Sequence, residues 1–108
     1  MKTVMSMRLV SSMIAQEEKR MNILKESYEE QLLTLPKGTL RVRQKGNNTY
    51  YYLSYRNGKK VATDYIGKDE DYILKIKEQL EKRRHIEEML KELNKELQLM
   101  KKVLGGVT

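Results

Sequence analysis

The stretch that decides the fold covers residues 39–66 and reads TLRVRQKGNNTYYYLSYRNGKKVATDYI. Its first seven residues alternate apolar and polar side chains, and the run that begins at Thr49 is rich in tyrosine; both patterns are typical of β-strands. Three such segments are separated by Gly46-Asn47-Asn48 and by Asn57-Gly58, and the second pair is a strong signal for a two-residue hairpin turn. The stretch therefore predicts a three-stranded antiparallel meander.

Long amphipathic helices are predicted on both sides of this stretch. Before it, apolar residues from Met7 to Tyr28 recur every three or four positions, and Pro36 stops the helix because the residue before a proline resists helical geometry. After it, acidic residues 69–71 begin a second helix, whose apolar line reaches Leu104 and includes Arg83 at one position. The fold class is therefore α+β, a single domain composed of helix 1–36, sheet 37–68, helix 69–104 and tail 105–108.

The apolar flank of the second helix changes sides near Arg83, which indicates a change of packing partner. We expect residues 69–84 to cross one face of the sheet, because a helix of that length (~24 Å) matches a seven-residue strand (~23 Å). Residues 86–104 are then expected to pair with the first helix as an antiparallel coiled coil. Roughly ten N-terminal residues would overhang this pair, and a second subunit could pair with them. We therefore expect a homodimer formed through the helices.

The net charge of +7 is concentrated in the sheet segment. Residues 1–36 carry five basic and five acidic side chains, and residues 69–108 carry nine of each, so the two helical segments are neutral. Residues 37–68 carry eight basic side chains against Asp64 alone. A cationic surface focused in one segment favours a polyanionic partner.

Strand alternation places most of this charge on one face of the sheet. If Asn57-Gly58 forms the turn, Tyr52 lies opposite Thr63, and Lys59 lies opposite Arg56. The more apolar face is expected to form the core, and its members are Leu40, Val42, Tyr51, Leu53, Tyr55, Ala62 and Ile66. The other face also holds Ser54, Val61 and Thr63. Its expected binding residues are Arg41, Arg43, Lys45, Tyr50, Tyr52, Arg56, Lys59 and Tyr65.

These binding-surface side chains have the chemistry that nucleic acid requires. Arginine and lysine neutralise phosphates, and tyrosine rings stack on unpaired bases. Arginine also reads guanine in the DNA major groove, which admits a β-ribbon, so DNA is favoured over RNA. We therefore expect a small nucleic-acid-binding accessory protein.

Two alternatives to nucleic-acid binding remain for the same surface. Tyrosine and arginine are also common anchors between proteins, so the chain could be a protein-interaction module that binds a nucleic-acid-binding protein. One form of this alternative is a phage or mobile-element inhibitor of a nucleoprotein machine such as a CRISPR nuclease. The other alternative is a purely structural surface, because tyrosine and threonine are ordinary strand residues.

Composition excludes several kinds of site. The chain has no cysteine, and its single histidine, His85, cannot form a metal cluster or a catalytic triad alone. No phosphate-binding loop or dinucleotide-binding glycine pattern occurs. We therefore expect no enzymatic activity, no cofactor and no bound metal. No apolar run reaches the ~20 residues that span a membrane, and the lack of cysteine suits the cytoplasm, so we expect a cytoplasmic protein without a membrane partner.

From Leu35 to about Leu97 the chain resembles a family of short prokaryotic proteins of unknown function. The resemblance rests on residues 35–40 (LPKGTL), 50–55 (YYYLSY), 57–59 (NGK) and 65–66 (YI), followed by a charged helix. It implies the fold alone, because the family has no assigned function. Residues 38–85 also resemble the arm-binding domains of tyrosine recombinases, which use a three-stranded sheet against the DNA major groove; this second resemblance implies DNA binding.

Overall fold

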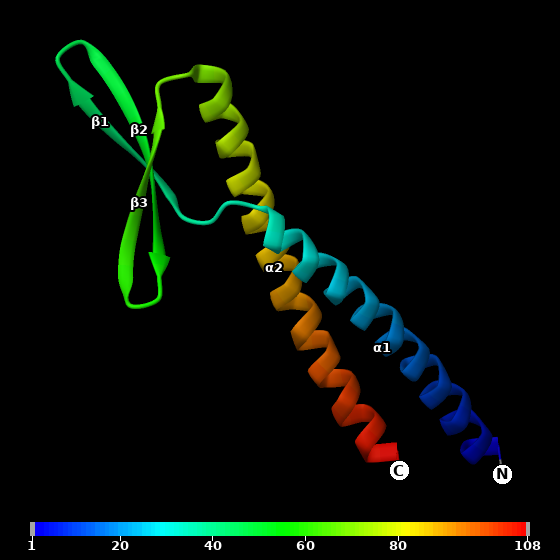
Figure 1. The fold of residues 1–108 in the computed structure, drawn as a ribbon. Coiled ribbons are helices and arrows are strands. Elements are labelled where there is room, and N and C mark those ends of the chain that lie inside the picture. Colours follow the sequence, from blue (N-terminus) through cyan, green and yellow to red (C-terminus); the bar gives the residue numbers. More distant parts are fainter. Residues whose placement is uncertain (1, 108) are drawn as a thin grey trace. The chain divides into compact units, whose positions relative to one another are not determined.

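In a computed structural model, the chain folds into helix α1 (Lys2–Thr34), strands β1 (Thr39–Lys45), β2 (Asn48–Asn57) and β3 (Lys60–Gly67), and helix α2 (Glu70–Val107) (Figure 1). The structure describes the backbone of residues 2–107 and the side chains of residues 8–105. The strands form one antiparallel sheet in the order β1-β2-β3. The predicted α+β fold class and the predicted meander are therefore confirmed. None of the described helices combines the length and apolar composition that crossing a membrane requires.

An aspartate cap fixes the start of α2. The Asp69 carboxylate accepts hydrogen bonds from the backbone amides of Asp71 (3.0 Å) and Tyr72 (3.4 Å), two donors that a helix leaves unsatisfied at its N-terminus. The other end differs from the prediction, because α2 continues through Gly105 to Val107 instead of ending at Leu104. Gly105 does not have a positive φ, so it does not form the left-handed cap that ends many helices.

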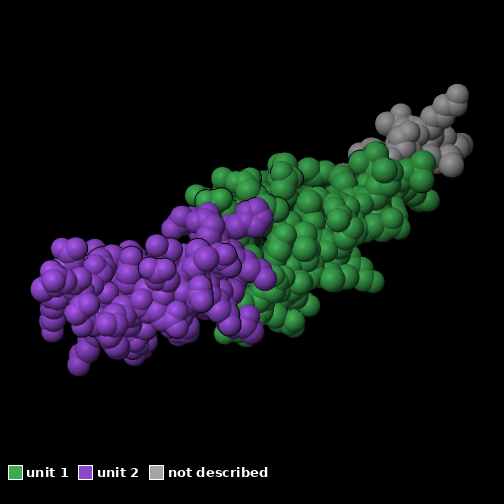
Figure 2. All heavy atoms as spheres, turned by 90° about the horizontal axis from the view of Figure 1, so that it is seen from above, with its two compact units in different colours: residues 1–33, 86–108 green, residues 34–85 purple. Residues whose placement is uncertain are grey.

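The chain forms two compact units (Figure 2). The helical unit combines residues 1–33 with residues 86–108, and the sheet unit contains residues 34–85. The boundary within α2 falls between His85 and Ile86, which agrees with the predicted change of packing partner near Arg83. The first half of α2 therefore belongs with the sheet and the second half with α1.

Within the helical unit, α1 and the second half of α2 run side by side in opposite directions (Figure 1). Ile86, Leu93 and Leu97 of α2 are buried, with exposed fractions of 2%, 7% and 5%. No described side chain of α1 is fully buried. The half-buried ones follow the predicted apolar stripe from Ile14 onward. Met7, the first member of the predicted stripe, lies outside the described side chains. The supercoiled packing of an antiparallel coiled coil stays a prediction.

The sheet unit has its core where the Leu53 face of the sheet meets the first half of α2. Leu53, Ile73 and Ile76 are 6%, 5% and 7% exposed. The Lys77 ammonium of α2 lies 5.6 Å from the centroid of the Tyr51 ring on this face. The prediction that Val42 belongs to the core is wrong, because this residue is 55% exposed on an edge strand of the sheet.

Both hairpin turns consist of a glycine followed by a second residue. Gly46-Asn47 joins β1 to β2 and Gly58-Lys59 joins β2 to β3, so the predicted Asn57-Gly58 turn is wrong by one residue. The type I′ turn that Asn-Gly favours needs a positive φ at both positions. Here only the glycine of each turn has one, +61° at Gly46 and +67° at Gly58, which is the pattern of a type II′ turn.

The shifted turn changes the β2–β3 register by two residues. Tyr52 pairs with Tyr65 instead of Thr63, and Lys59 lies in the turn instead of opposite Arg56. Because side chains alternate between the faces of a sheet with a period of two, this shift leaves the strand side chains on their predicted faces. The error in register therefore did not become an error in the predicted surface, except at Lys59.

Arg83 joins the α1–β1 connection to α2. Its partly buried guanidinium donates hydrogen bonds from Nε to the Pro36 carbonyl (2.8 Å) and from Nη2 to the Leu35 carbonyl (3.1 Å). Leu35 and Pro36 directly follow Thr34, the last residue of α1, so these bonds hold the first residues of the connection to β1. The single polar residue on the predicted apolar line thus caps a chain segment from another part of the sequence.

Replacing Arg83 with methionine is expected to lower the free energy of unfolding by about 2–3 kcal/mol, because two partly buried carbonyls lose a charged donor while the apolar stem is kept. Arg84→Met is the matched control. Arg84 pairs with Glu81 on the exposed surface (2.9 Å), where an ion pair contributes about 0.5 kcal/mol. Urea unfolding followed by circular dichroism compares the variants, and equal losses would contradict the capping role of Arg83.

Candidate nucleic-acid interface

The face of the sheet opposite the core gathers basic and tyrosine side chains. Cross-strand partners share a face, and Arg41 pairs with Tyr52 while Arg43 pairs with Tyr50. On the other side of β2, Tyr65 pairs with Tyr52. Strand alternation adds Lys45 to the same side. We call this surface the open face and define it by Arg41, Arg43, Lys45, Tyr50, Tyr52 and Tyr65.

The ring of Tyr65 contacts the two other tyrosine rings of the open face. The centroid of the Tyr65 ring lies 5.4 Å from that of Tyr52, with 60° between the ring planes, and 6.2 Å from that of Tyr50, with 41° between the planes. The guanidinium carbon of Arg43 lies 5.4 Å from the Tyr52 centroid, within range of a cation–π interaction. These tilted contacts position the rings without stacking one flat on another.

A small hollow lies among these rings. It has a volume of about 210 Å³ and is lined by Lys45, Tyr50, Tyr52 and Tyr65. Tyr65 is 60% exposed, whereas Tyr50 and Tyr52 are half-buried. The hollow therefore presents one accessible aromatic ring with a lysine at its side.

A β-bulge in β3 directly follows Tyr65. Tyr51 pairs with Gly67 while Tyr52 pairs with Tyr65, so Ile66 is an extra residue between two cross-strand pairs. Gly67 has a φ of +104°, which residues other than glycine rarely adopt. In the sequence, Gly67 indicates only the end of a strand, so the bulge was not predicted.

Two of the predicted binding residues lie apart from this cluster. Arg56 is exposed and shares the side of Tyr52, but it lies four positions further along β2, a distance of about 13 Å. Lys59 belongs to the Gly58-Lys59 turn. The structure thus brings six of the predicted residues together and leaves Arg56 and Lys59 at the other end of the β2–β3 hairpin.

The one acidic residue of the sheet segment does not neutralise the open face. Asp64 pairs with Leu53 and so lies on the opposite side of the sheet. There it accepts a hydrogen bond from the Tyr55 hydroxyl, which raises the pKa of Tyr55 above the ordinary value of tyrosine. Among the residues that the structure describes, no three histidine, aspartate or glutamate side chains gather as metal ligands would.

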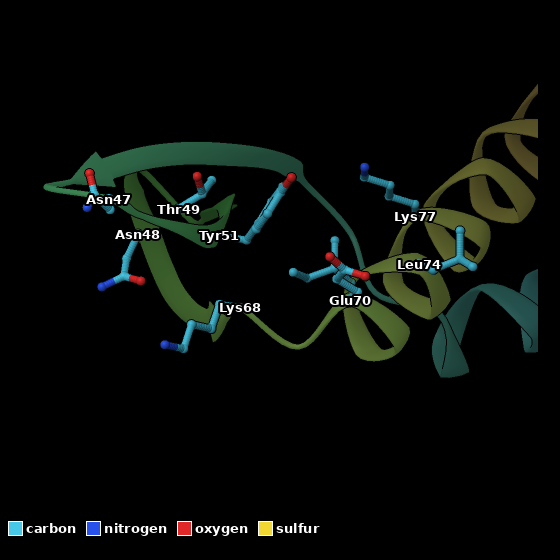
Figure 3. Close-up of a pocket in the computed structure, with 9 residues that line it drawn as sticks. Asn47, Asn48, Thr49, Tyr51, Lys68, Glu70, Leu74 and Lys77 are labelled. Carbon is cyan, nitrogen blue, oxygen red and sulfur yellow. The ribbon is translucent and has the colours of Figure 1, made fainter.

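A second, larger hollow lies on the core side of the sheet unit (Figure 3). Figure 3 shows Tyr51 on the sheet and Lys77 on α2 bordering this space, which has a volume of about 630 Å³. Its lining mixes amides, two lysines, one carboxylate and apolar groups, and consists of Asn47, Asn48, Thr49, Tyr51, Lys68, Glu70, Ile73, Leu74 and Lys77. The sequence did not predict this hollow, because it forms between elements that are distant along the chain.

Comparison with known proteins identifies the family to which the chain belongs. Residues 14–75 match the model of a protein family described as a domain of unknown function (DUF6788). The match covers more than half of the chain and includes the whole sheet, which agrees with the predicted resemblance to a family of unknown function, although it begins within α1 and not at Leu35. No curated protein and no solved structure matches the chain. The resemblance to the arm-binding domains of tyrosine recombinases finds no support in these comparisons.

Proposed function

Because the chain belongs to the DUF6788 family, whose description names no activity, we propose its function from the open face. We infer that the protein binds nucleic acid, with DNA preferred over RNA, and that it is a non-enzymatic accessory protein. The observation that carries this proposal is the pairing of Arg41 and Arg43 with Tyr52 and Tyr50 on one face. This arrangement places groups that bind phosphate beside groups that stack on bases.

The charge distribution supports a polyanionic partner. The sheet segment, residues 37–68, holds the whole net charge of +7. Arg41, Arg43 and Lys45 are exposed, and side chains on one side of a strand follow each other at about 6.6 Å. A row of three cations at this spacing suits successive phosphates of one nucleic-acid strand.

Titration of a labelled oligonucleotide at several salt concentrations tests the proposal. Contacts from Arg41, Arg43 and Lys45 to three phosphates predict that log K falls with log salt, with a slope of about −2.7 for duplex DNA and about −2.1 for a single strand. Absence of binding at low salt, or an affinity that salt leaves unchanged, would contradict the proposal. A stoichiometric protein partner recovered under those conditions would favour the protein-interaction module instead.

We also propose that the helical unit pairs with a second copy of the chain. Leu9, Val10 and Met13 near the start of α1 are 66%, 50% and 67% exposed, and Leu99 near the end of α2 is 58% exposed. Two helices with apolar residues outside their shared core resemble half of a four-helix bundle. Sedimentation equilibrium is expected to show a dimer that Leu9→Glu plus Met13→Glu dissociates, and a monomeric wild-type protein would contradict this proposal.

A further inference from the structure

The hollow of the open face has a shape and chemistry that electrostatic binding alone does not require. Its four lining residues supply three aromatic rings and one ammonium. The Tyr52 ring already has the Arg43 guanidinium near it, whereas Tyr65 meets its neighbours at angles of 60° and 41° and is 60% exposed. Tyr65 is therefore the ring that can accept a flat ligand.

The ligand that suits this hollow is flat, aromatic and attached to negative charge. Lys45 lines the hollow. Arg43 lies two residues before Lys45 and on the same side of β1. A nucleotide combines a π-face for Tyr65 with a phosphate for these cations. A base inside a duplex cannot use the hollow, because its two faces are stacked on neighbouring bases.

We propose that this hollow takes one unpaired nucleobase, stacked on Tyr65, with the adjoining phosphates bound by Lys45 and Arg43. The inference rests on the proposed function and narrows the substrate class to single strands and to duplexes with an unpaired nucleotide. In this proposal, Tyr65 distinguishes unpaired from paired nucleic acid. Arg43 and Lys45 of β1 supply the affinity for phosphate, which is common to unpaired and paired nucleic acid.

The first test uses the wild-type protein and three labelled probes of equal length: oligothymidylate, the same strand with abasic positions, and a duplex. Stacking predicts that oligothymidylate binds about 5- to 150-fold more tightly than the abasic strand, because one stacked base contributes that factor. The chain has seven tyrosines and no tryptophan, so quenching of tyrosine fluorescence by oligothymidylate reports the same event.

The second test changes the ring. Tyr65→Ala is expected to remove the preference for oligothymidylate over the abasic strand, whereas Tyr65→Phe keeps the preference because the ring remains. Tyr72→Ala is the matched control, since Tyr72 is 47% exposed on α2 outside the hollow. Tyr65→Leu, which removes the ring but keeps an apolar side chain, takes the place of the alanine variant if that variant fails to fold, and it is also expected to lose the preference.

The outcomes separate this inference from the proposed function. Equal affinity for all three probes with a steep salt dependence would overturn the inference and leave nucleic-acid binding in place. Loss of the preference in Tyr72→Ala as well as in Tyr65→Ala would assign the effect to general destabilisation and would also overturn it. Absence of binding to every probe would overturn both.

Discussion

Arg41→Ala combined with Arg43→Ala is expected to weaken nucleic-acid binding about 25-fold for a single strand and about 60-fold for a duplex at 0.1 M salt, because two phosphate contacts are lost. The slope of log K against log salt should become shallower by about 1.4 for a single strand and by about 1.8 for a duplex. Both residues are exposed on an edge strand, so the fold should tolerate the change. Fluorescence anisotropy at several salt concentrations measures affinity and slope together.

Lys101→Ala combined with Lys102→Ala is the matched control for this variant. It also removes two positive charges from the chain, but from exposed positions near the end of α2 and not from the sheet. If binding depended only on net charge, the two double variants would lose affinity equally. That result would remove the reason for placing the interface on the open face.

Gly38→Ala is expected to lower the free energy of unfolding by about 3 kcal/mol or more, because it combines backbone strain with overpacking. Gly38 has a φ of +120°. A Cβ at this position would overlap the Ser54 carbonyl oxygen and would lie 2.9 Å from the Tyr55 Cβ. The connection to β1 would have to move away from β2, which should appear as a lower urea midpoint.

Gly46→Ala separates backbone strain from close packing. Gly46 also has a positive φ, +61°, but an added Cβ would meet nothing within 4 Å. Strain alone predicts a loss of about 1 kcal/mol at this turn. Similar losses in the two variants would show that the close approach of Gly38 to β2 contributes little to stability.

The sequence was sufficient to predict the sheet and the composition of its charged face. Alternation in β1 and the tyrosine run of β2 are local patterns, and their period of two kept the face assignment correct when the turn was misplaced. The misplacement has a local cause: Asn57-Gly58 and Gly58-Lys59 are both acceptable turns, and the choice depends on which residue adopts a positive φ. For this reason Lys59 lies in the turn and not among the strand residues of the predicted binding surface.

Other features depend on contacts between distant parts of the chain. In the sequence, Arg83 is a polar residue on an otherwise apolar line. Only the folded structure shows that its guanidinium binds the Leu35 and Pro36 carbonyls. The bulge at Ile66 likewise needs the pairing of β2 with β3. Both features combine residues whose separation in sequence carries no periodic signal, so hydrophobic patterning could not have found them.

The division of α2 between two units has a consequence for cooperativity. A helix requires a costly nucleus but extends readily, so one nucleation event in α2 serves the helical unit and the sheet unit together. Loss of packing in either unit leaves half of the same helix without its tertiary support, and fraying then advances toward His85 and Ile86. The two units therefore share one folding element, and each is expected to raise the other's melting temperature.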